Sequence, residues 1–89
     1  MVEFVNEPVS VEVKLRRDGT ARPLAFVWRG RRFQIESWGR EGIETREGNT
    51  VHCHLVQTAG LETWEICQNT DTSKWILVRH WTRRYRTVA

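Results

Sequence analysis

The chain has 89 residues, a mean hydropathy of −0.56 and a formal net charge of +3. This length predicts a single domain, and no apolar run approaches the roughly 18 residues that a membrane-spanning helix needs, so we expect no membrane partner. The start, MVEFVNEP, has neither the basic nor the apolar region of a signal peptide. That absence predicts a cytoplasmic protein in which Cys53 and Cys67 are free thiols.

The first predicted strand follows a short N-terminal arm. Residues 1–8 are expected to be loosely held, with Pro8 at the entry to the strand. Residues 9–15 read V-S-V-E-V-K-L, which is the alternation of a half-buried antiparallel strand whose four apolar side chains face the core. Asp18 and Gly19 then form a turn.

Apolar residues alternate on both sides of Gly30 in the stretch LAFVWRGRRFQIESW, which predicts two strands joined by a tight turn. A type II′ turn at Gly30 and Arg31 needs positive φ only at the glycine, whereas a turn at Arg29 and Gly30 needs it at an arginine as well. The first turn is therefore favoured, and it pairs Trp28 with Phe33. The rejected turn shifts the pairing by two residues and keeps the same apolar face.

A second hairpin is predicted from two runs joined at Ala59 and Gly60, residues 50–58 and 61–68. This turn sets His54 opposite Glu65. A slip of the register would set Cys53 opposite Cys67, where a disulfide could form.

Three further segments complete the chain. Residues 39–49 hold three glycines and mixed charges without a period, so we predict a loop. Residues 74–81 carry apolar side chains on both faces, which predicts a strand that is central or that closes a barrel. Residues 83–89 are a basic tail.

These elements amount to about six short strands, in a single domain with a β core at residues 9–82. We expect an all-β antiparallel fold, either a single small SH3-like barrel or a strongly bent meander, because curling hides the strand edges. An OB-like barrel is the alternative, but no helix of the usual length lies between the strands.

Arginines and aromatic rings lie together at the WRGRRF turn and again near the C-terminus. Single-stranded nucleic acid is bound in this way, with arginines on phosphates and rings on bases. We therefore predict a nucleic-acid-associated accessory module, for single- or double-stranded nucleic acid. The candidate binding residues are Arg29, Arg31, Arg32, Arg79, Trp81, Arg83, Arg84 and Tyr85. The alternative is a protein-interaction module that docks a partner strand on an open edge or in an aromatic groove, without nucleic acid.

A metal site is the next hypothesis that the residue types suggest. His52 and His54 form a His-x-His pair, which on a strand places both imidazoles on one face, and His80 and Cys67 could add ligands. The four residues are spread over three predicted strands, so we expect no metal.

Catalysis has little support in the sequence. Glu62 and Glu65 lie on opposite faces of one predicted strand and cannot act as an acid/base pair. Cys67 beside His52 resembles a nucleophile and base, but a third group to orient the histidine is missing. We expect no enzyme activity, no cofactor and no small-molecule substrate.

The segment FVWRGRRF at residues 26–33, followed by Trp38 and by KWIL at residues 74–77, resembles a small uncharacterised bacterial domain family. Those domains share a Phe-x-Trp-Arg-Gly-Arg-Arg-aromatic hairpin and a late Trp-x-Leu strand. They occur alone or behind the polymerase body of proteins resembling Y-family translesion DNA polymerases. The resemblance implies a bacterial cytosolic protein linked to DNA repair, with a repair protein as a partner, and it carries over no catalytic residue.

Overall fold

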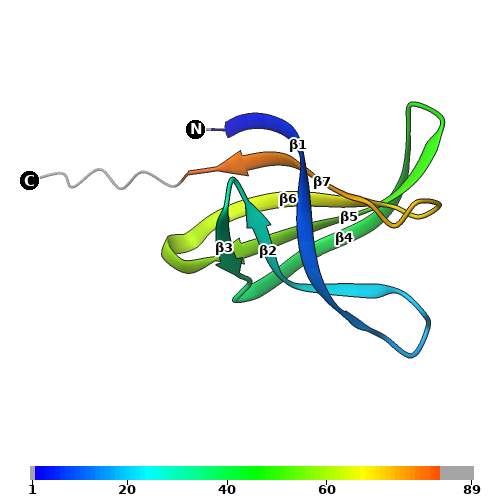
Figure 1. The fold of residues 1–89 in the computed structure, drawn as a ribbon, viewed down its shortest axis with the longest axis horizontal. Coiled ribbons are helices and arrows are strands. Elements are labelled where there is room, and N and C mark those ends of the chain that lie inside the picture. Colours follow the sequence, from blue (N-terminus) through cyan, green and yellow to red (C-terminus); the bar gives the residue numbers. More distant parts are fainter. Residues whose placement is uncertain (1, 83–89) are drawn as a thin grey trace, which may run out of the picture.

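A computed structural model describes residues 2–82, apart from the side chain of Leu61, and within that range seven strands form one antiparallel sheet (Figure 1). The strands are β1 (Val2–Leu15), β2 (Ala21–Trp28), β3 (Arg31–Gln34), β4 (Ser37–Arg46), β5 (Asn49–Thr58), β6 (Glu62–Asn69) and β7 (Trp75–Trp81). One short 3₁₀ turn, Ala59–Leu61, links β5 to β6. No helix in this part of the chain has the length and apolar character needed to cross a membrane.

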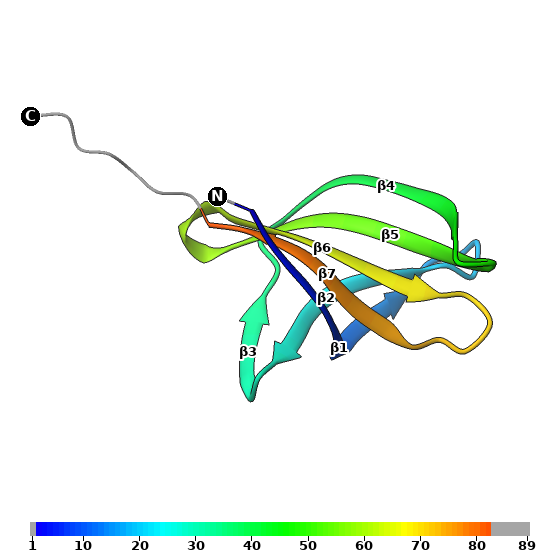
Figure 2. The ribbon, with the colours of Figure 1, turned by 90° about the horizontal axis from the view of Figure 1, so that it is seen from above.

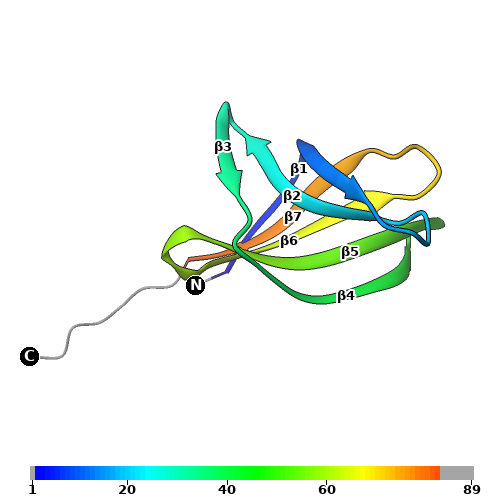
Figure 3. The same cartoon turned by 90° about the horizontal axis from the view of Figure 1, so that it is seen from below.

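The sheet is bent sharply at β1, which pairs with different neighbours along its length. The strand order is β3-β2-β1-β7-β6-β5-β4. The first part of β1 pairs with β7, and the part after Val9 pairs with β2. Figures 2 and 3 show β2 and β3 folded to one side of the layer that β4 to β7 form. We call the layer of β4–β7 with the start of β1 the main layer, and the layer of β2, β3 and the end of β1 the small layer.

This arrangement confirms the all-β fold in its bent-meander form. The predicted barrel is not formed, because the sheet ends at β3 and β4 without closing among the described residues. Residues 74–81 are predicted to form a strand that is central or that closes a barrel. The central place is confirmed, since β7 is the middle strand of the sheet. Apolar residues on both faces suit that central place.

The core lies between the two layers. Phe26 of the small layer meets Trp64 of the main layer edge-to-face, with 5.1 Å between ring centroids, and stacks on Phe33 at the same separation. Ile66 and Leu77 are fully buried beneath these rings. The inward residues of each strand alternate with outward ones, as the period of two predicts.

The prediction for the N-terminus is wrong. Residues 1–8 do not form a loose arm over the described part, because Val2 begins β1 and pairs with Trp81 of β7. Val13 and Leu15, which are predicted to face the core, are 40% and 71% exposed. A β-bulge after Glu12 shifts the pairing with β2, and beyond it the β1–β2 hairpin extends past the core (Figure 1).

The turn at Gly30 is the one that the sequence analysis rejects. Arg29 and Gly30 have φ of +52° and +76°, and Trp28 pairs with Arg31. The apolar face is kept, as expected for a shift of two residues, and Phe26 now lies opposite Phe33. The side chain of Arg29, whose backbone has this unusual positive φ, contacts Glu7 and the ring of Trp28.

The predicted loop at residues 39–49 is a strand and a tight turn. β4 extends to Arg46, and Glu47 and Gly48 turn the chain with φ of +50° and +78°. β4 is an edge strand whose side chains are almost all exposed. A strand exposed on both faces has no need of alternating hydrophobicity, so its period is missing from the sequence.

The register of the second hairpin is displaced by one residue from the favoured prediction. The 3₁₀ turn places three residues at the tip, and His54 lies opposite Ile66 instead of Glu65. Cys53 lies opposite Cys67 with 4.0 Å between their Cα atoms, and the two form a disulfide. The expectation of free thiols is therefore wrong.

Candidate nucleic-acid interface

The arginines of the β2–β3 hairpin are held by acidic residues of β1. Arg29 donates to Glu7, with 2.7 Å between Nη2 and Oε2, and Arg32 donates to Glu12 over 2.7 Å. These hydrogen bonds hold the pKa of each glutamate below its ordinary value. Only Arg31 has no ion pair within residues 2–82 among the three hairpin arginines. The hairpin tip therefore offers less positive charge than its sequence indicates.

Trp28 belongs to the core and has little free ring surface for stacking. Its indole N–H donates to Glu7 over 2.9 Å, and its ring lies edge-on to Trp64 with 5.7 Å between centroids. The guanidinium of Arg29 covers the ring at 4.4 Å from its centroid. A side chain enclosed in this way positions the hairpin, and it is not available to a nucleic-acid base.

Arg79 and Trp81 lie on the outer face of the main layer, away from the core. Between them in the chain, His80 points inward and stacks on Trp64, with 3.6 Å between centroids and 5° between planes. Alternation along β7 therefore directs both neighbours outward. The Arg79 guanidinium lies 4.8 Å from the centroid of the Trp81 ring. The structure separates this pair from the hairpin arginines, so the predicted residues do not form one patch.

Phe4 joins this outer pair, although the sequence analysis places it in the arm. Phe4 lies directly opposite Arg79 on β1, and its side chain therefore projects from the same face of the sheet. It is 68% exposed, which is unusual for a phenylalanine. The alternation of Val2 and Phe4 with glutamate and valine in the sequence was the only signal, and it is too short to establish a strand.

A buried carboxylate orders the arginines on the outer face. Glu65 is 6% exposed and accepts from Arg79 Nε at 2.6 Å and from Arg46 Nη2 at 3.1 Å. The two guanidinium groups are about one-third exposed, so each can contact a further ligand. Glu65 thus fixes their positions and cancels part of their charge.

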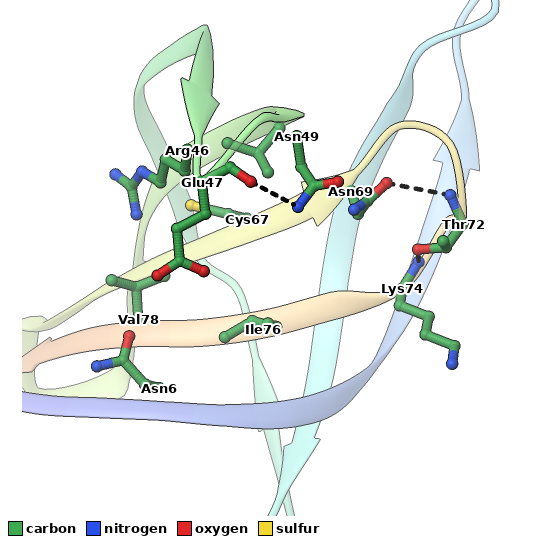
Figure 4. Close-up of a pocket in the computed structure, with 11 residues that line it drawn as sticks. Asn6, Arg46, Glu47, Asn49, Cys67, Asn69, Thr72, Lys74, Ile76 and Val78 are labelled. Carbon is green, nitrogen blue, oxygen red and sulfur yellow. Dashed lines mark hydrogen bonds between the residues drawn. The ribbon is translucent and has the colours of Figure 1, made fainter.

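Two depressions mark this outer face. The first, of about 510 Å³, has an apolar floor and a rim of amide and charged side chains (Figure 4). Its floor is formed by Val51, Cys67, Ile76 and Val78, and its rim includes Asn6, Arg46, Asn49, Asn69 and Lys74. The second, of about 430 Å³, is lined by Arg40, Arg46, Arg79, Leu55 and Trp81, and also by three glutamates and a histidine: Glu41, Glu44, Glu65 and His54. Arg46 lines both, so the two depressions are neighbours. We call Phe4, Arg40, Arg46, Arg79 and Trp81 the Trp81 face.

The excess positive charge of the chain lies in the residues that follow β7 in the sequence. Residues 1–82 carry eleven basic and eleven acidic side chains, so the formal excess of +3 comes entirely from Arg83, Arg84 and Arg86. The predicted site residues Arg83, Arg84 and Tyr85 lie outside the described residues. They begin two residues after Trp81 in the chain, whereas the hairpin tip is distant in sequence.

The residues of the metal and catalytic hypotheses are separated. His52 and His54 lie on one face of β5 with 4.4 Å between ring centroids, as the His-x-His spacing predicts, but His80 packs on Trp64 instead. Cys67 is bonded to Cys53 and is therefore neither a thiolate ligand nor a nucleophile. The four residues do not form a single site.

Comparisons with known proteins add no relative to this picture. No protein-family model, no curated protein and no solved structure matches the chain. We therefore infer the function from the chemistry of the described surface.

Proposed function

We propose that this protein is an accessory module that binds single-stranded nucleic acid through the Trp81 face. The observation that carries the proposal is the placement of an exposed ring, Phe4, and a half-buried ring, Trp81, beside the Arg79 guanidinium on one face of the sheet. Rings that stack on bases beside cations that meet phosphates are the two elements of sequence-tolerant single-strand binding.

The chemistry of each group supports a single strand over a duplex. Stacking of a base on a protein ring contributes about 1–3 kcal/mol, and it requires a base that is not already stacked in a helix. Arg79 and Arg46 are held in place by Glu65, so little side-chain entropy is lost when they meet phosphate oxygens. Arg83 and Arg84 would supply the further attraction that the neutral body of the domain lacks.

Fluorescence anisotropy with labelled single-stranded and duplex oligonucleotides tests this proposal. For three or four phosphate contacts, affinity for the single strand should fall roughly 20- to 50-fold between 50 and 200 mM salt. The duplex should bind more weakly. No binding at 50 mM salt would reject the proposal.

Two matched arginine variants locate the surface. Arg40 and Arg31 are both exposed, and neither has an ion pair within residues 2–82. Arg40→Gln should weaken binding several-fold and reduce the salt dependence, whereas Arg31→Gln should have little effect. The opposite order would place the interface at the hairpin and not at the Trp81 face.

A protein-interaction module is the second candidate, and exposed apolar side chains favour it. Val2, Phe4 and Ile76 are 40%, 68% and 44% exposed, and the pairing of the first two places them on the outer face of the main layer. In that case oligonucleotides should not bind at low salt. A pull-down should instead return repair or recombination proteins after nuclease treatment, and Phe4→Ala should abolish their capture.

The link to DNA repair and the cytoplasmic location are parts of the proposal that depend on the family resemblance and on the N-terminal sequence. A reducing cytoplasm keeps most thiols reduced, so the disulfide gives a direct test of the location. Rapid acid quenching of cells followed by thiol alkylation would show whether Cys53 and Cys67 are bonded in place. A fully oxidised pair would count against the cytoplasm.

A further inference from the structure

A cluster of three metal-ligand side chains, Glu41, His52 and His54, lies where β4 pairs with β5. Glu41 is opposite His54 across the two strands, and its carboxylate reaches both histidines of the His-x-His pair. Oε2 of Glu41 lies 2.7 Å from His52 Nε2 and 3.9 Å from His54 Nδ1. One ligand atom from each residue lies within 4.8 Å of the other two.

These separations suit a tetrahedral ion. Nitrogen and oxygen ligands that bind zinc at about 2.0–2.2 Å in a tetrahedron lie roughly 3.3 Å from each other. The observed 2.7 Å and 3.9 Å fall on either side of this value, so shifts of less than about 1 Å would bring the ligand atoms to it. The β4–β5 pairing holds the two backbones, and only side-chain rotations are needed.

The surroundings resemble those of a metal site with one open side. His52 and His54 are 8% and 3% exposed, and the ring of Trp75 lies 5.6 Å from that of His54. The Glu41 side chain is 38% exposed, which leaves an approach for an ion and for a water molecule as a fourth ligand. His54 Nε2 is buried and has no hydrogen-bond partner among the described groups, so the ring is free of constraint at that atom.

Within residues 2–82, Arg16 opposes an ion at this cluster. It donates to both carboxylate oxygens of Glu41, at 3.0 Å to Oε2 and 2.9 Å to Oε1. An arriving ion would replace Nη1 at Oε2, while Nη2 would keep Oε1 in place. Hydrogen bonds that orient a ligand carboxylate in this way are usual in metal sites, but the positive charge of Arg16 lowers the affinity.

We propose that Glu41, His52 and His54 form a binding site for one divalent transition-metal ion of the zinc class, completed by water. Two imidazoles and a carboxylate are the ligands of open zinc sites, whereas magnesium and calcium prefer oxygen ligands alone. None of the three ligands is one of the rings or arginines that define the Trp81 face, although Glu41 and His54 also line the second depression beside it.

Titration of the metal-free, disulfide-bonded full chain with Zn²⁺ and Co²⁺ tests the site. We expect one ion per chain, visible absorption bands typical of four-coordinate Co²⁺, and a rise in Tm of about 10 °C or more at a hundredfold excess of Zn²⁺ over its Kd. Mg²⁺ at the same concentration should leave Tm unchanged.

Three variants separate this site from unspecific histidine binding. Glu41→Gln and His52→Gln should each weaken Zn²⁺ binding at least tenfold and remove the Co²⁺ bands, whereas His80→Gln should change neither. Glu41 is exposed, so its variant keeps the test valid if His52→Gln does not fold, and circular dichroism checks the fold of each. Equal Zn²⁺ binding by the wild type and Glu41→Gln, or no binding at 100 µM Zn²⁺, would overturn the proposal.

Discussion

Removing the Cys53–Cys67 disulfide should lower the free energy of unfolding by about 3 kcal/mol. The bond joins residues 14 apart in sequence, and closing a loop of about 15 residues reduces the entropy of the unfolded chain by roughly that amount. A domain of this size is stable by about 4–13 kcal/mol in total. The disulfide would therefore supply a large fraction of its stability.

The loss can be measured by urea unfolding followed by tryptophan fluorescence, with and without a phosphine reductant. With a slope of about 1 kcal/mol per M, typical of a small domain, the midpoint should fall by about 3 M urea, and Tm should fall by roughly 12–24 °C. The double variant Cys53→Ala/Cys67→Ala is the control, and reductant should not affect it. β5 and β6 pair along their whole length without the bond, so the reduced protein should keep its fold.

A midpoint that moves by less than 0.5 M urea would refute this reasoning. Such a result would mean either that the two cysteines are not joined in solution or that the unfolded hairpin remains ordered without the bond. Mass measurement after alkylation of the native protein distinguishes the two, because free thiols add the mass of the label.

Gly30→Val should lower the free energy of unfolding by about 1–3 kcal/mol, because Gly30 has φ of +76°. Gly42→Val, on exposed β4, is the control and should be nearly neutral. Equal Tm values for the two variants would contradict a positive φ at Gly30. Glu65→Gln should lower the free energy of unfolding by about 1–2 kcal/mol, measured by urea unfolding, because its partners Arg46 and Arg79 are partly solvated. The same variant should bind oligonucleotides more tightly at low salt, because the charge of the two arginines is no longer neutralised. Burial lowers the pKa of His54 from 6.5 to about 4. In the presence of a chelator, stability should therefore be nearly constant above about pH 7 and fall by about 2 kcal/mol between pH 7 and pH 5, because only the unfolded chain gains a proton there. His54→Gln should flatten this dependence, and an unchanged slope would assign it to other groups.

Alternating residues were enough to predict every strand except β4 and the first half of β1, but not the inward face of β5, which carries His52 and His54. Phe26, Trp64 and Leu77 are buried where the period of two places them, and β7 is the middle strand of the sheet. The same local signal located the tight turns at Gly19 and Gly30, where positive φ favours glycine. Such features depend only on neighbours in the chain, so the sequence contains them directly.

The candidate surface could be predicted only in part. Arg79 and Trp81 share a face because they are two residues apart on one strand, which the sequence shows. Phe4 and Arg46 come from β1 and β4, and they reach this face through pairings that connect distant parts of the chain. The ion pairs that occupy Arg29 and Arg32 likewise depend on glutamates about twenty residues away.

The sequence by itself determined the all-β class, most of the strands and the residue types available for binding. The tertiary structure alone decided the register of the β5–β6 hairpin, and with it the disulfide. It further decided the pairing of β4 with β5, which places His54 beside Glu41. It also decided that β1 turns from one layer to the other and leaves the sheet open. Local period is set by the backbone, whereas register and closure are set by the packing of residues far apart in the chain, which composition and spacing do not encode.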